Sequence, residues 1–364
     1  MDKEQQALQA LREKIDTLDQ QLQRLLNQRA TLAQQVAEIK IAHGHQGDFY
    51  RPEREARVLS AIKQNNQGPL SDDAIATLFR EIMSACLAVE KPLSVAFLGP
   101  IGSYTEIAAQ KQFGHAVGLV AESSIEEIFH AVASRRVDYG VVPVENSTEG
   151  AVRQTLDCFL SNDIGINGEV LLPIHHALLA LTPTLSEVEV IYGHEQALAQ
   201  CRQWLQQHCP QCEQVSVKSN AYAVKKIALT QQNNAAAIAD ERAAKHYDLQ
   251  VIARHIEDKA DNTTRFLVIG HQRLSASGQD KTSLLVATEN QPGALHQLLT
   301  PFAEHGIMLT GIESRPSKQG QWQYVFFIDV EGHYLEPALQ QVLETIEKHS
   351  LRCQLLGSYP KAIL

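Results

Sequence analysis

The sequence predicts a multidomain protein in which an all-helical segment precedes two segments of mixed α and β structure. Its 364 residues exceed what one hydrophobic core usually organises. The apolar spacing is helical up to about residue 90, strands and helices then alternate, and the C-terminal part follows the order βαββαβ. The predicted units are residues 1–91, 92–272 and 281–364.

The first segment predicts a long helix that needs a partner. Its apolar residues recur at alternating steps of three and four, as in a coiled coil, at Leu8, Leu11, Ile15, Leu18, Leu22, Leu25, Leu32, Val36 and Ile39. A helix of about 36 residues would be about 54 Å long, which is too long and too one-sided to be stable alone. Two further helices are predicted, from Pro52 to about Asn65 and from Ser71 to Glu90, with Ser71 as an N-cap.

The middle segment alternates short β-rich runs with amphipathic helical runs. Strands are expected at Ser94–Leu98, Val141–Val144, Val190–Tyr192, Val215–Val217, Ala236–Ala239 and Phe266–Ile269. Helices are expected at Ser124–Arg136, Ala151–Leu160, Gln196–His208 and Asn220–Thr230. This alternation predicts two small α/β lobes with largely parallel sheets and a cleft between them.

The last segment follows a polar tract, Leu274–Asp280, that has the composition of a linker. Beyond it we expect a ferredoxin-like βαββαβ fold. Its predicted strands and helices, in chain order, are Ser283–Ala287, Gly293–His305, Met308–Ser314, Gln323–Val330, Pro337–His349 and Arg352–Tyr359.

Composition excludes several classes of function. The net charge of -10 argues against a nucleic-acid binder, which needs clustered Lys and Arg. The N-terminal sequence lacks the apolar core of a signal peptide, and no apolar run approaches the length of a membrane span. We therefore expect a cytoplasmic protein that binds neither nucleic acid nor membranes.

The six cysteines are too sparse for a disulfide scaffold. Cys201, His208, Cys209 and Cys212 leave two alternatives open, a zinc or redox site and structurally idle thiols. The idle thiols are favoured because the chain has no second Cys-x-x-Cys pair. We expect no metal and no cofactor.

Arg29 interrupts the apolar seam of the first helix. It could set helix register, or it could belong to an anion site inside a helical bundle. Lys40 lies eleven residues further on and within about 20° on the same face, which favours the anion site. Arg12 lies about 25 Å away along the helix and on another face, so it could reach only the pocket of a partner chain.

These cations resemble a known family, the all-helical chorismate mutases. The resemblance covers residues 4–90 and depends on Leu11–Asp16, Arg29, Lys40, Arg54-Glu55 and Phe79–Ser84. It implies an intertwined helical dimer whose active site takes an arginine from the other subunit. Such a site suits a pericyclic rearrangement, which needs a compact substrate conformer and stabilised charge separation but no nucleophile.

The resemblance also implies the role of each residue. Arg12 of the partner and Arg29 would hold the two carboxylates of chorismate. Lys40 would donate to the ether oxygen that breaks, Glu55 would accept from the ring hydroxyl, and Arg54 would order the site.

Three positions depart from the commonest pattern of that family. Arg51 stands where many members have Asp, and Cys86 and Glu90 stand where Ser and Gln are frequent. Cys86 is a candidate substrate contact. Glu90 could help at the breaking ether oxygen only when it is protonated, because an ionised carboxylate only accepts hydrogen bonds.

Polar clusters at three predicted strand ends point to a second site, since ligands bind there in α/β sheets. They are Gly99-Pro-Ile-Gly102-Ser103-Tyr104, Val142–Gly150 and Asn262–Phe266. Together they resemble prephenate dehydratase over about residues 93–271. By this resemblance Thr264 would act as the acid, Arg265 would order the site or bind a carboxylate, and Phe266 would pack the ring pocket. Ser103, Glu145, Asn146, Ser147 and Thr148 would complete the cleft. His176, His194 and Gln196 also match this family, and a core histidine is an equally good reading of both histidines.

The last segment contains Gly293-Ala294-Leu295-His296 at the start of a predicted helix and Glu313-Ser314-Arg315-Pro316 at the end of a strand. These runs resemble the ACT regulatory domain of prephenate dehydratases, which binds phenylalanine across a domain pair. A helix start suits the carboxylate of an amino acid, and Glu313 suits its ammonium group. A folding or dimerisation module is the alternative.

Taken together, the resemblances imply an enzyme that converts chorismate to prephenate and prephenate to phenylpyruvate under control by phenylalanine, as a homodimer or larger homo-oligomer. Two alternatives remain. The first is a non-catalytic, two-lobed amino-acid sensor, which would leave the cations of the helical segment unexplained. The second is a dehydratase whose helices serve only for dimerisation. It would not explain why these charged residues follow the same order as in chorismate mutases.

Overall fold

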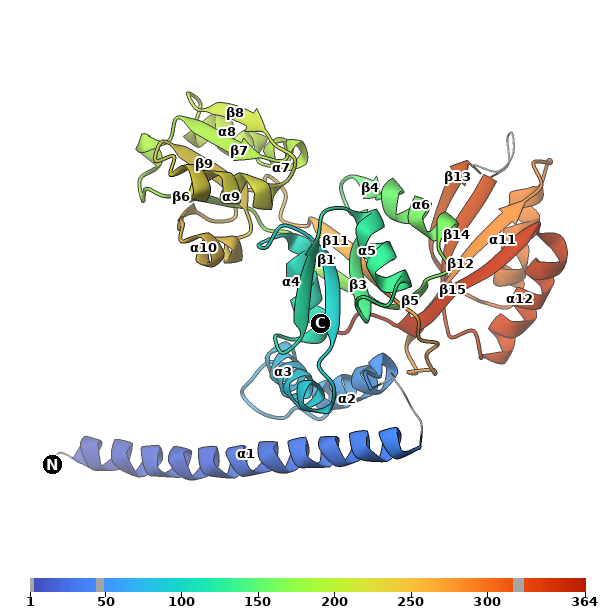
Figure 1. The fold of residues 1–364 in the computed structure, drawn as a ribbon, viewed down its shortest axis with the longest axis horizontal. Helices are drawn as coiled ribbons and strands as arrows, with labels where there is room; N and C mark the ends of the chain where they lie inside the picture. The colour runs from blue at the N-terminus through green and yellow to red at the C-terminus, as the bar shows by residue number, and fades with distance from the viewer. Residues whose placement is uncertain (1–2, 44–48, 317–323) are drawn as a thin grey trace.

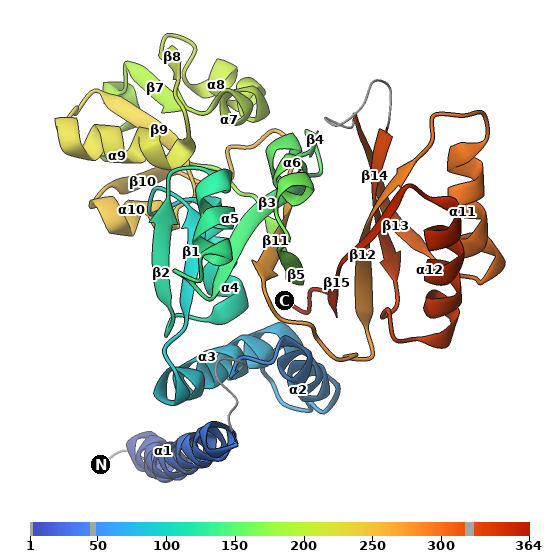
Figure 2. The same cartoon turned by 45° about the vertical axis from the view of Figure 1, so that its right-hand side comes forward.

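The computed structural model describes residues 3–43, 49–316 and 324–364 (Figure 1). Its N-terminal part is helical, with α1 (Lys3–Ala42), α2 (Pro52–Gln64) and α3 (Asp72–Glu90), as predicted. The Ser71 hydroxyl accepts a hydrogen bond from the Ala74 amide at 3.2 Å, which confirms the predicted N-cap. Helix α1 runs as one rod beneath α2 and α3 in both views (Figures 1 and 2).

The apolar seam of α1 is uncovered within one chain. Ala37 is the single buried residue of this helix, and Leu11, Leu25 and Ile39 are 57%, 60% and 61% exposed. A 40-residue amphipathic helix with its apolar stripe in water lacks the burial that normally stabilises such helices.

The first α/β lobe is built on a sheet in the order β2-β1-β3-β11-β5, with β4 paired to β3. Its strands β1, β2 and β3 are parallel, whereas β11 is antiparallel to both β3 and β5. The elements are β1 (Ser94–Leu98), α4 (Tyr104–Phe113), β2 (Gly118–Glu122), α5 (Ile125–Ala133), β3 (Tyr139–Asn146), β4 (Gly150–Ala151), α6 (Arg153–Ser161), β5 (Gly165–Pro173) and β11 (Thr263–Gly270).

The second lobe has a sheet in the order β10-β6-β9-β7-β8. Here β7, β8 and β9 are parallel, while β6 is antiparallel to β9 and β10. The elements are β6 (Ala177–Ala180), the 3-10 turn η1 (Leu185–Glu187), β7 (Val190–Gly193), α7 (Glu195–Gln200), α8 (Arg202–His208), β8 (Glu213–Ser216), α9 (Asn220–Thr230), β9 (Ala235–Ala239), α10 (Arg242–Tyr247) and β10 (Gln250–Ala253).

Several details of this segment differ from the sequence prediction: β2, β5, β6, β10 and α10 were not predicted, and two further differences concern the sheets and one helix. Each sheet is mixed rather than largely parallel, because the chain crosses between the lobes twice and each crossing leaves antiparallel strands. The predicted helix Gln196–His208 is broken into α7 and α8 at Cys201, whose ψ of 13° leaves the helical range. Cys201 is fully buried, so the residue at which the helix breaks contributes its side chain to the core.

The C-terminal unit has the predicted βαββαβ order. Its elements are β12 (Asp280–Thr288), α11 (Ala294–Glu304), β13 (Leu309–Pro316), β14 (Tyr324–Glu331), α12 (Pro337–His349) and β15 (Arg352–Pro360). The four strands pair antiparallel in the order β13-β14-β12-β15, and both helices cover one face of that sheet (Figure 2). The predicted start of the third strand, Gln323, lies outside the described residues.

The linker tract is better anchored than its composition predicts. Leu274 is buried and its carbonyl is 3.1 Å from Nε2 of the buried His333, and the Asp280 carboxylate accepts from the amides of Ser277 and Gly278. These contacts fix the C-terminal unit against the first lobe. Among the described residues, no helix combines the length and apolarity that a bilayer-spanning helix requires.

Candidate active sites

The helical unit contains an open cavity of about 290 Å³ between α1, α2 and α3. Both ends of its lining are charged, and its middle is apolar. Six of the predicted mutase residues line it together: Arg29, Lys40, Arg54, Glu55, Cys86 and Glu90. Arg51, the position that departs from the commonest pattern, lines the same cavity.

Glu55 is held by a partner that sequence reasoning did not assign. Its carboxylate forms an ion pair with Arg80 of α3, and Arg80 also donates to the carbonyl of Gln112 in the first α/β lobe. Burial raises the pKa of Glu55, and the charges of Arg80 and Arg29 oppose that rise. Arg80 therefore orients Glu55 and links the mutase cavity to the next unit.

Glu90 lies where a protonated carboxyl is favoured. Burial raises its pKa, and the charges of Lys40 and Arg29 act in the opposite direction without cancelling the rise. The Lys40 ammonium group is 3.4 Å from the Phe49 carbonyl and lies 5.3 Å from the centre of the Phe49 ring. These contacts hold Lys40 at the cavity.

Arg12 is absent from this cavity. It is exposed near the far end of α1, separated from Arg29 by 17 residues, or about 25 Å of helix. The straight helix in Figure 1 offers no bend that would bring the two arginines together.

The second cavity, of about 300 Å³, lies between the two α/β lobes. Ser103, Asn146, His194, Thr264 and Phe266, all predicted site residues, line it. The N-terminal turns of α4 and α9 also line the cleft, with Ser103 and Ser219 as their caps. Free backbone N–H groups at helix starts favour anions, and Lys218 adds a positive charge.

Thr264 is oriented by a hydrogen bond. Asn146 donates from Nδ2 to the Thr264 hydroxyl at 2.8 Å and to Oδ1 of Asn262 at 2.9 Å. Because the Thr264 oxygen accepts this bond, its own O–H remains available to donate into the cleft.

Three predicted substrate contacts, Glu145, Ser147 and Thr148, are exposed and are not among the residues that line this cavity. The Ser147 hydroxyl accepts from the amide of Thr263, and Thr148 donates from its amide and its hydroxyl to Oδ1 of Asn146. Glu145 is exposed on the other side of the strand. Ser147 and Thr148 therefore position Asn146 and the start of β11, and substrate binding by these three residues stays a prediction.

Arg265 faces away from this cleft, and its predicted role, to order the site or bind a carboxylate, stays a prediction. Successive side chains of a strand point to opposite faces, so Thr264 and Phe266 line the cleft while Arg265 points toward the C-terminal unit. Its guanidinium pairs with Asp329 at 2.5 Å and with Glu169 at 2.8 Å, and it donates to the Tyr359 hydroxyl at 3.0 Å.

His176 is a buried residue of the cleft wall. Its ring nitrogens are 2.8 Å from the Tyr104 hydroxyl and 2.9 Å from the Gln200 amide oxygen, and burial lowers its pKa. It is therefore a neutral, hydrogen-bonded residue next to the candidate substrate site. His194 and Gln196 line the cleft at the start of α7.

The two predicted regulatory runs lie apart within one chain. Gly293 caps α11 with φ of 85°, and Leu295 and His296 are exposed beside it. Glu313 and Ser314 are exposed on β13, an edge strand, and Arg315 is paired with Asp157 of the first lobe at 2.7 Å. The remaining members of these runs are Ala294 and Pro316.

The three cysteines of this region, Cys201, Cys209 and Cys212, belong to one hydrophobic core cluster of the second lobe. Cys201 and Cys209 are buried, and the Cys212 thiol donates to the Val188 carbonyl. Burial raises the pKa of Cys209 to about 11, which keeps it a thiol, whereas metals bind the thiolate. His208 stacks on Trp204 instead of facing the cysteines.

Sequence reasoning missed several residues that line the two cavities. Tyr50 closes the mutase cavity, and Lys218, Asn220 and Asp240 come to the cleft from the second lobe. The signal for Asn220 was present, since Lys218-Ser219-Asn220 begins a predicted helix directly after a predicted strand.

Comparisons with known proteins agree with this division into sites. The chain matches the family models for chorismate mutase type II over residues 11–91, prephenate dehydratase over 95–274 and the ACT domain over 282–348. It is 52% identical over 365 residues to the bifunctional chorismate mutase/prephenate dehydratase of Pseudomonas aeruginosa, covering 99% of this chain and 100% of that protein.

Two solved structures resemble its α/β and C-terminal units. One is prephenate dehydratase from Arthrobacter aurescens in complex with L-Phe, with 33% identity, a TM-score of 0.69 and coverage of 74% of this chain and 90% of that one. The other, titled as GqqA, a novel type of quorum quenching acylases, has 27% identity and a TM-score of 0.69, covering 74% and 98%. The chain therefore belongs to the bifunctional chorismate mutase/prephenate dehydratase family and has an ACT domain in its C-terminal part.

Proposed function

We infer that the chain rearranges chorismate to prephenate in the helical cavity and converts prephenate to phenylpyruvate in the cleft between the lobes. The observation that carries this inference is the separation of two motif sets into two cavities of one chain. The 52% sequence identity with a bifunctional relative, which extends over the full length of both chains, supports this inference. A non-catalytic amino-acid sensor would have no use for the cations of the helical cavity.

In the mutase step the ether C–O bond of chorismate breaks while a C–C bond forms. Arg29 binds one substrate carboxylate, and Lys40 donates to the ether oxygen as negative charge develops there. Glu55, oriented by Arg80, accepts from the ring hydroxyl. Arg54 orders the cavity, Glu90 donates to the ether oxygen when protonated, and Cys86 contacts the substrate.

The second substrate carboxylate needs a cation that one chain does not place in the cavity. We propose that Arg12 of a partner chain supplies it when two α1 helices pack along their exposed apolar seams. The uncovered leucines of α1 support this assembly, because an apolar stripe of that length gains stability on burial.

In the dehydratase step prephenate loses carbon dioxide and water and takes up one proton, and aromatisation of the ring provides the driving force. The helix starts and Lys218 bind the carboxylates, and Phe266 packs against the ring. Ser103, His194 and Asn146 complete the cleft. Thr264, oriented by Asn146, donates to the ring hydroxyl as it departs.

Phenylalanine binds the ACT domain and inhibits the dehydratase in this proposal. The L-Phe complex of a structural neighbour supports the choice of ligand. Gly293–His296 and Glu313–Pro316 form the binding site between two copies of the domain.

Arg265 offers a physical route from that domain to the cleft. Arg265 follows Thr264 on β11 and pairs with Asp329 on β14. Because of this ion pair, a movement of the ACT sheet would also displace the strand that carries Thr264. The Glu169 side chain, which is 2% exposed, forms ion pairs with both Arg265 and Lys281 of β12. The Glu169–Lys281 pair is therefore a second contact between the first lobe and the ACT domain.

The domain boundaries proposed here are residues 1–91, 92–272 and 281–364. Two features support them: α3 ends at Glu90, and β11 ends at Gly270 before the anchored tract that leads into β12.

The function is tested by incubating the purified chain with chorismate while prephenate and phenylpyruvate are measured, with and without phenylalanine. Prephenate should appear first, phenylpyruvate should follow, and phenylalanine should suppress the second product. Failure to consume chorismate would remove the mutase assignment, and accumulation of prephenate alone would remove the dehydratase assignment.

A further inference from the structure

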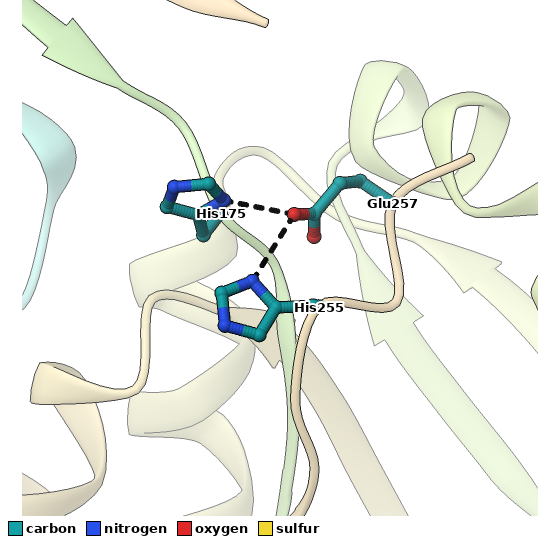
Figure 3. Close-up of side chains that lie close together, drawn as sticks. All are labelled: His175, His255 and Glu257. Carbon is teal, nitrogen blue, oxygen red and sulfur yellow. Dashed lines mark hydrogen bonds and ion pairs between the residues drawn. The ribbon is translucent and has the colours of Figure 1, made fainter. Parts of the chain in front are cut away.

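A cluster of potential metal ligands lies in neither of the two cavities described above. His175 and His255 each direct a ring nitrogen toward Oε1 of Glu257, and one ligand atom from each of the three residues lies within 4.8 Å of the others (Figure 3). Oε1 of Glu257 is 2.9 Å from Nδ1 of His175 and 3.5 Å from Nδ1 of His255. It is the one such group among the residues that the structure describes.

The three residues come from the two connections that join the lobes. His175 lies between β5 of the first lobe and β6 of the second. His255 and Glu257 lie on the return path, between β10 of the second lobe and β11 of the first. The cluster therefore joins the connection from β5 to β6 with the connection from β10 to β11, at the place where the chain passes between the two lobes.

We propose that His175, His255 and Glu257 bind one divalent transition-metal ion of the zinc class and thereby clamp the two connections together. Two imidazoles and one carboxylate are a donor set that suits zinc, cobalt or nickel better than magnesium or calcium, which prefer oxygen ligands. Three protein ligands leave the fourth position of the ion to water.

The spacing of the ligand atoms fits such an ion. With bonds of about 2.0–2.1 Å, tetrahedral ligands lie roughly 3.3 Å apart. The observed separations of 2.9 and 3.5 Å lie on either side of that value, so small side-chain movements suffice. The carboxylate is also preoriented, because its other oxygen accepts from the backbone amide of His176 at 2.8 Å.

Burial and backbone conformation single out the same residues. The Glu257 side chain is 3% exposed, and burying a carboxylate is costly unless it is paired with a cation or hydrogen-bonded. His255 has φ of 52°, an uncommon conformation for a residue other than glycine, and this places its ring over the carboxylate. A bound cation would balance the buried charge.

Such a clamp would act on the substrate cleft through the neighbouring backbone. The Tyr104 hydroxyl donates to the His175 carbonyl at 2.7 Å, and both Tyr104 and His176 line the cleft. The metal would limit how far the lobes separate without touching the substrate. This role is structural, so it does not depend on the chemistry proposed above.

The test is a titration of the full-length, tag-free, metal-stripped chain with Co²⁺, followed by its visible absorption, and with Zn²⁺ as competitor. One equivalent of Co²⁺ should bind per chain and be displaced by Zn²⁺. His175→Ala, His255→Asn and Glu257→Gln should each weaken binding by more than about 100-fold, since even outer-shell substitutions cost about 10–100-fold. Asn tolerates the left-handed backbone and Gln keeps the acceptor for His176, so these variants should fold.

Matched controls separate this site from other ligands of the chain. His208→Ala and the double variant Cys209→Ser/Cys212→Ser should bind Co²⁺ like the unsubstituted chain. No Co²⁺ binding by the unsubstituted chain would overturn the proposal. Binding that survives in His255→Asn but is lost in the double cysteine variant would also overturn it, because the metal would then belong to the thiols.

Discussion

The helical cavity and the cleft between the lobes differ in how completely one chain builds them. One chain supplies the whole lining of the cleft, including the oriented Thr264 hydroxyl and the helix starts that favour anions. The lining residues come from segments as distant in sequence as Ser103 and Thr264. The helical cavity has Arg29 and Lys40 but not Arg12, which lies on the same helix about 25 Å away. A compact α/β fold can gather residues that are distant in sequence, whereas a rigid helix keeps its own residues apart.

This difference explains why the two activities should respond differently to assembly and to substitution. In the proposed function the mutase cavity takes Arg12 from a partner helix, whereas the dehydratase cleft is linked to the ACT domain through the Arg265–Asp329 ion pair. Arg80 joins the helical cavity to the first α/β lobe, because it pairs with Glu55 and donates to the carbonyl of Gln112. The Gln112 amide in turn donates to the hydroxyl of Tyr50, which lines the same cavity.

The largest expected effect is the loss of one activity without the other. Arg29→Ala should lower the mutase rate by about 10²–10³-fold, the usual cost of removing a charge-stabilising donor, and leave the dehydratase rate unchanged. Thr264→Ala should lower the dehydratase rate by at least about 10²-fold and spare the mutase. Both rates are measured on each purified variant, and loss of both in a folded variant would contradict the separation.

A smaller effect should appear in the pH dependence of the mutase. Burial raises the pKa of Glu90, so its protonated, donating form persists to higher pH than for an exposed glutamate. Mutase activity should therefore rise by up to about tenfold per unit as pH falls from about 8 toward about 6. Glu90→Gln should flatten this profile, because an amide donates at every pH.

The dehydratase profile of the same protein serves as the control for the Glu90 experiment. It should be identical in Glu90→Gln and in the unsubstituted chain, since Glu90 lies in the other cavity. If the mutase rate of the unsubstituted chain is level over this range, Glu90 does not act at the reacting centre.

The smallest expected effect concerns regulation. Asp329→Asn removes the charge that pairs with Arg265 at the contact with the ACT domain. Inhibition by phenylalanine should weaken by about fivefold or more, within the usual range of allosteric coupling, while turnover without phenylalanine stays near normal. Glu331→Gln is the matched control, because Glu331 of the same strand pairs with Lys361 at the surface.

The fold was predictable from sequence where local pattern decides the structure. The spacing of apolar residues defined α1, and the Ser71 cap and the βαββαβ order were both confirmed. Pairing direction was not predictable, because the antiparallel position of β11 depends on the chain returning from the second lobe.

Sequence motifs predicted which segments form the two cavities, but they did not predict which way each side chain points. Motif matching assigned Thr264, Arg265 and Phe266 to one site, whereas strand alternation directs Arg265 toward the ACT domain. His175 and His255 are 80 residues apart, so no local spacing could indicate that they share a carboxylate.

The most direct test of the comparison is mutase activity in mixed dimers of Arg12→Ala and Arg29→Ala chains. In such a dimer one pocket receives both intact arginines and the other receives neither, so about half of the mutase sites should recover. A partner chain that carries both substitutions is the control and should restore nothing. Recovery to that level would support a mutase site shared between chains. No recovery in verified mixed dimers would show that Arg12 and Arg29 act within one chain, which contradicts the account.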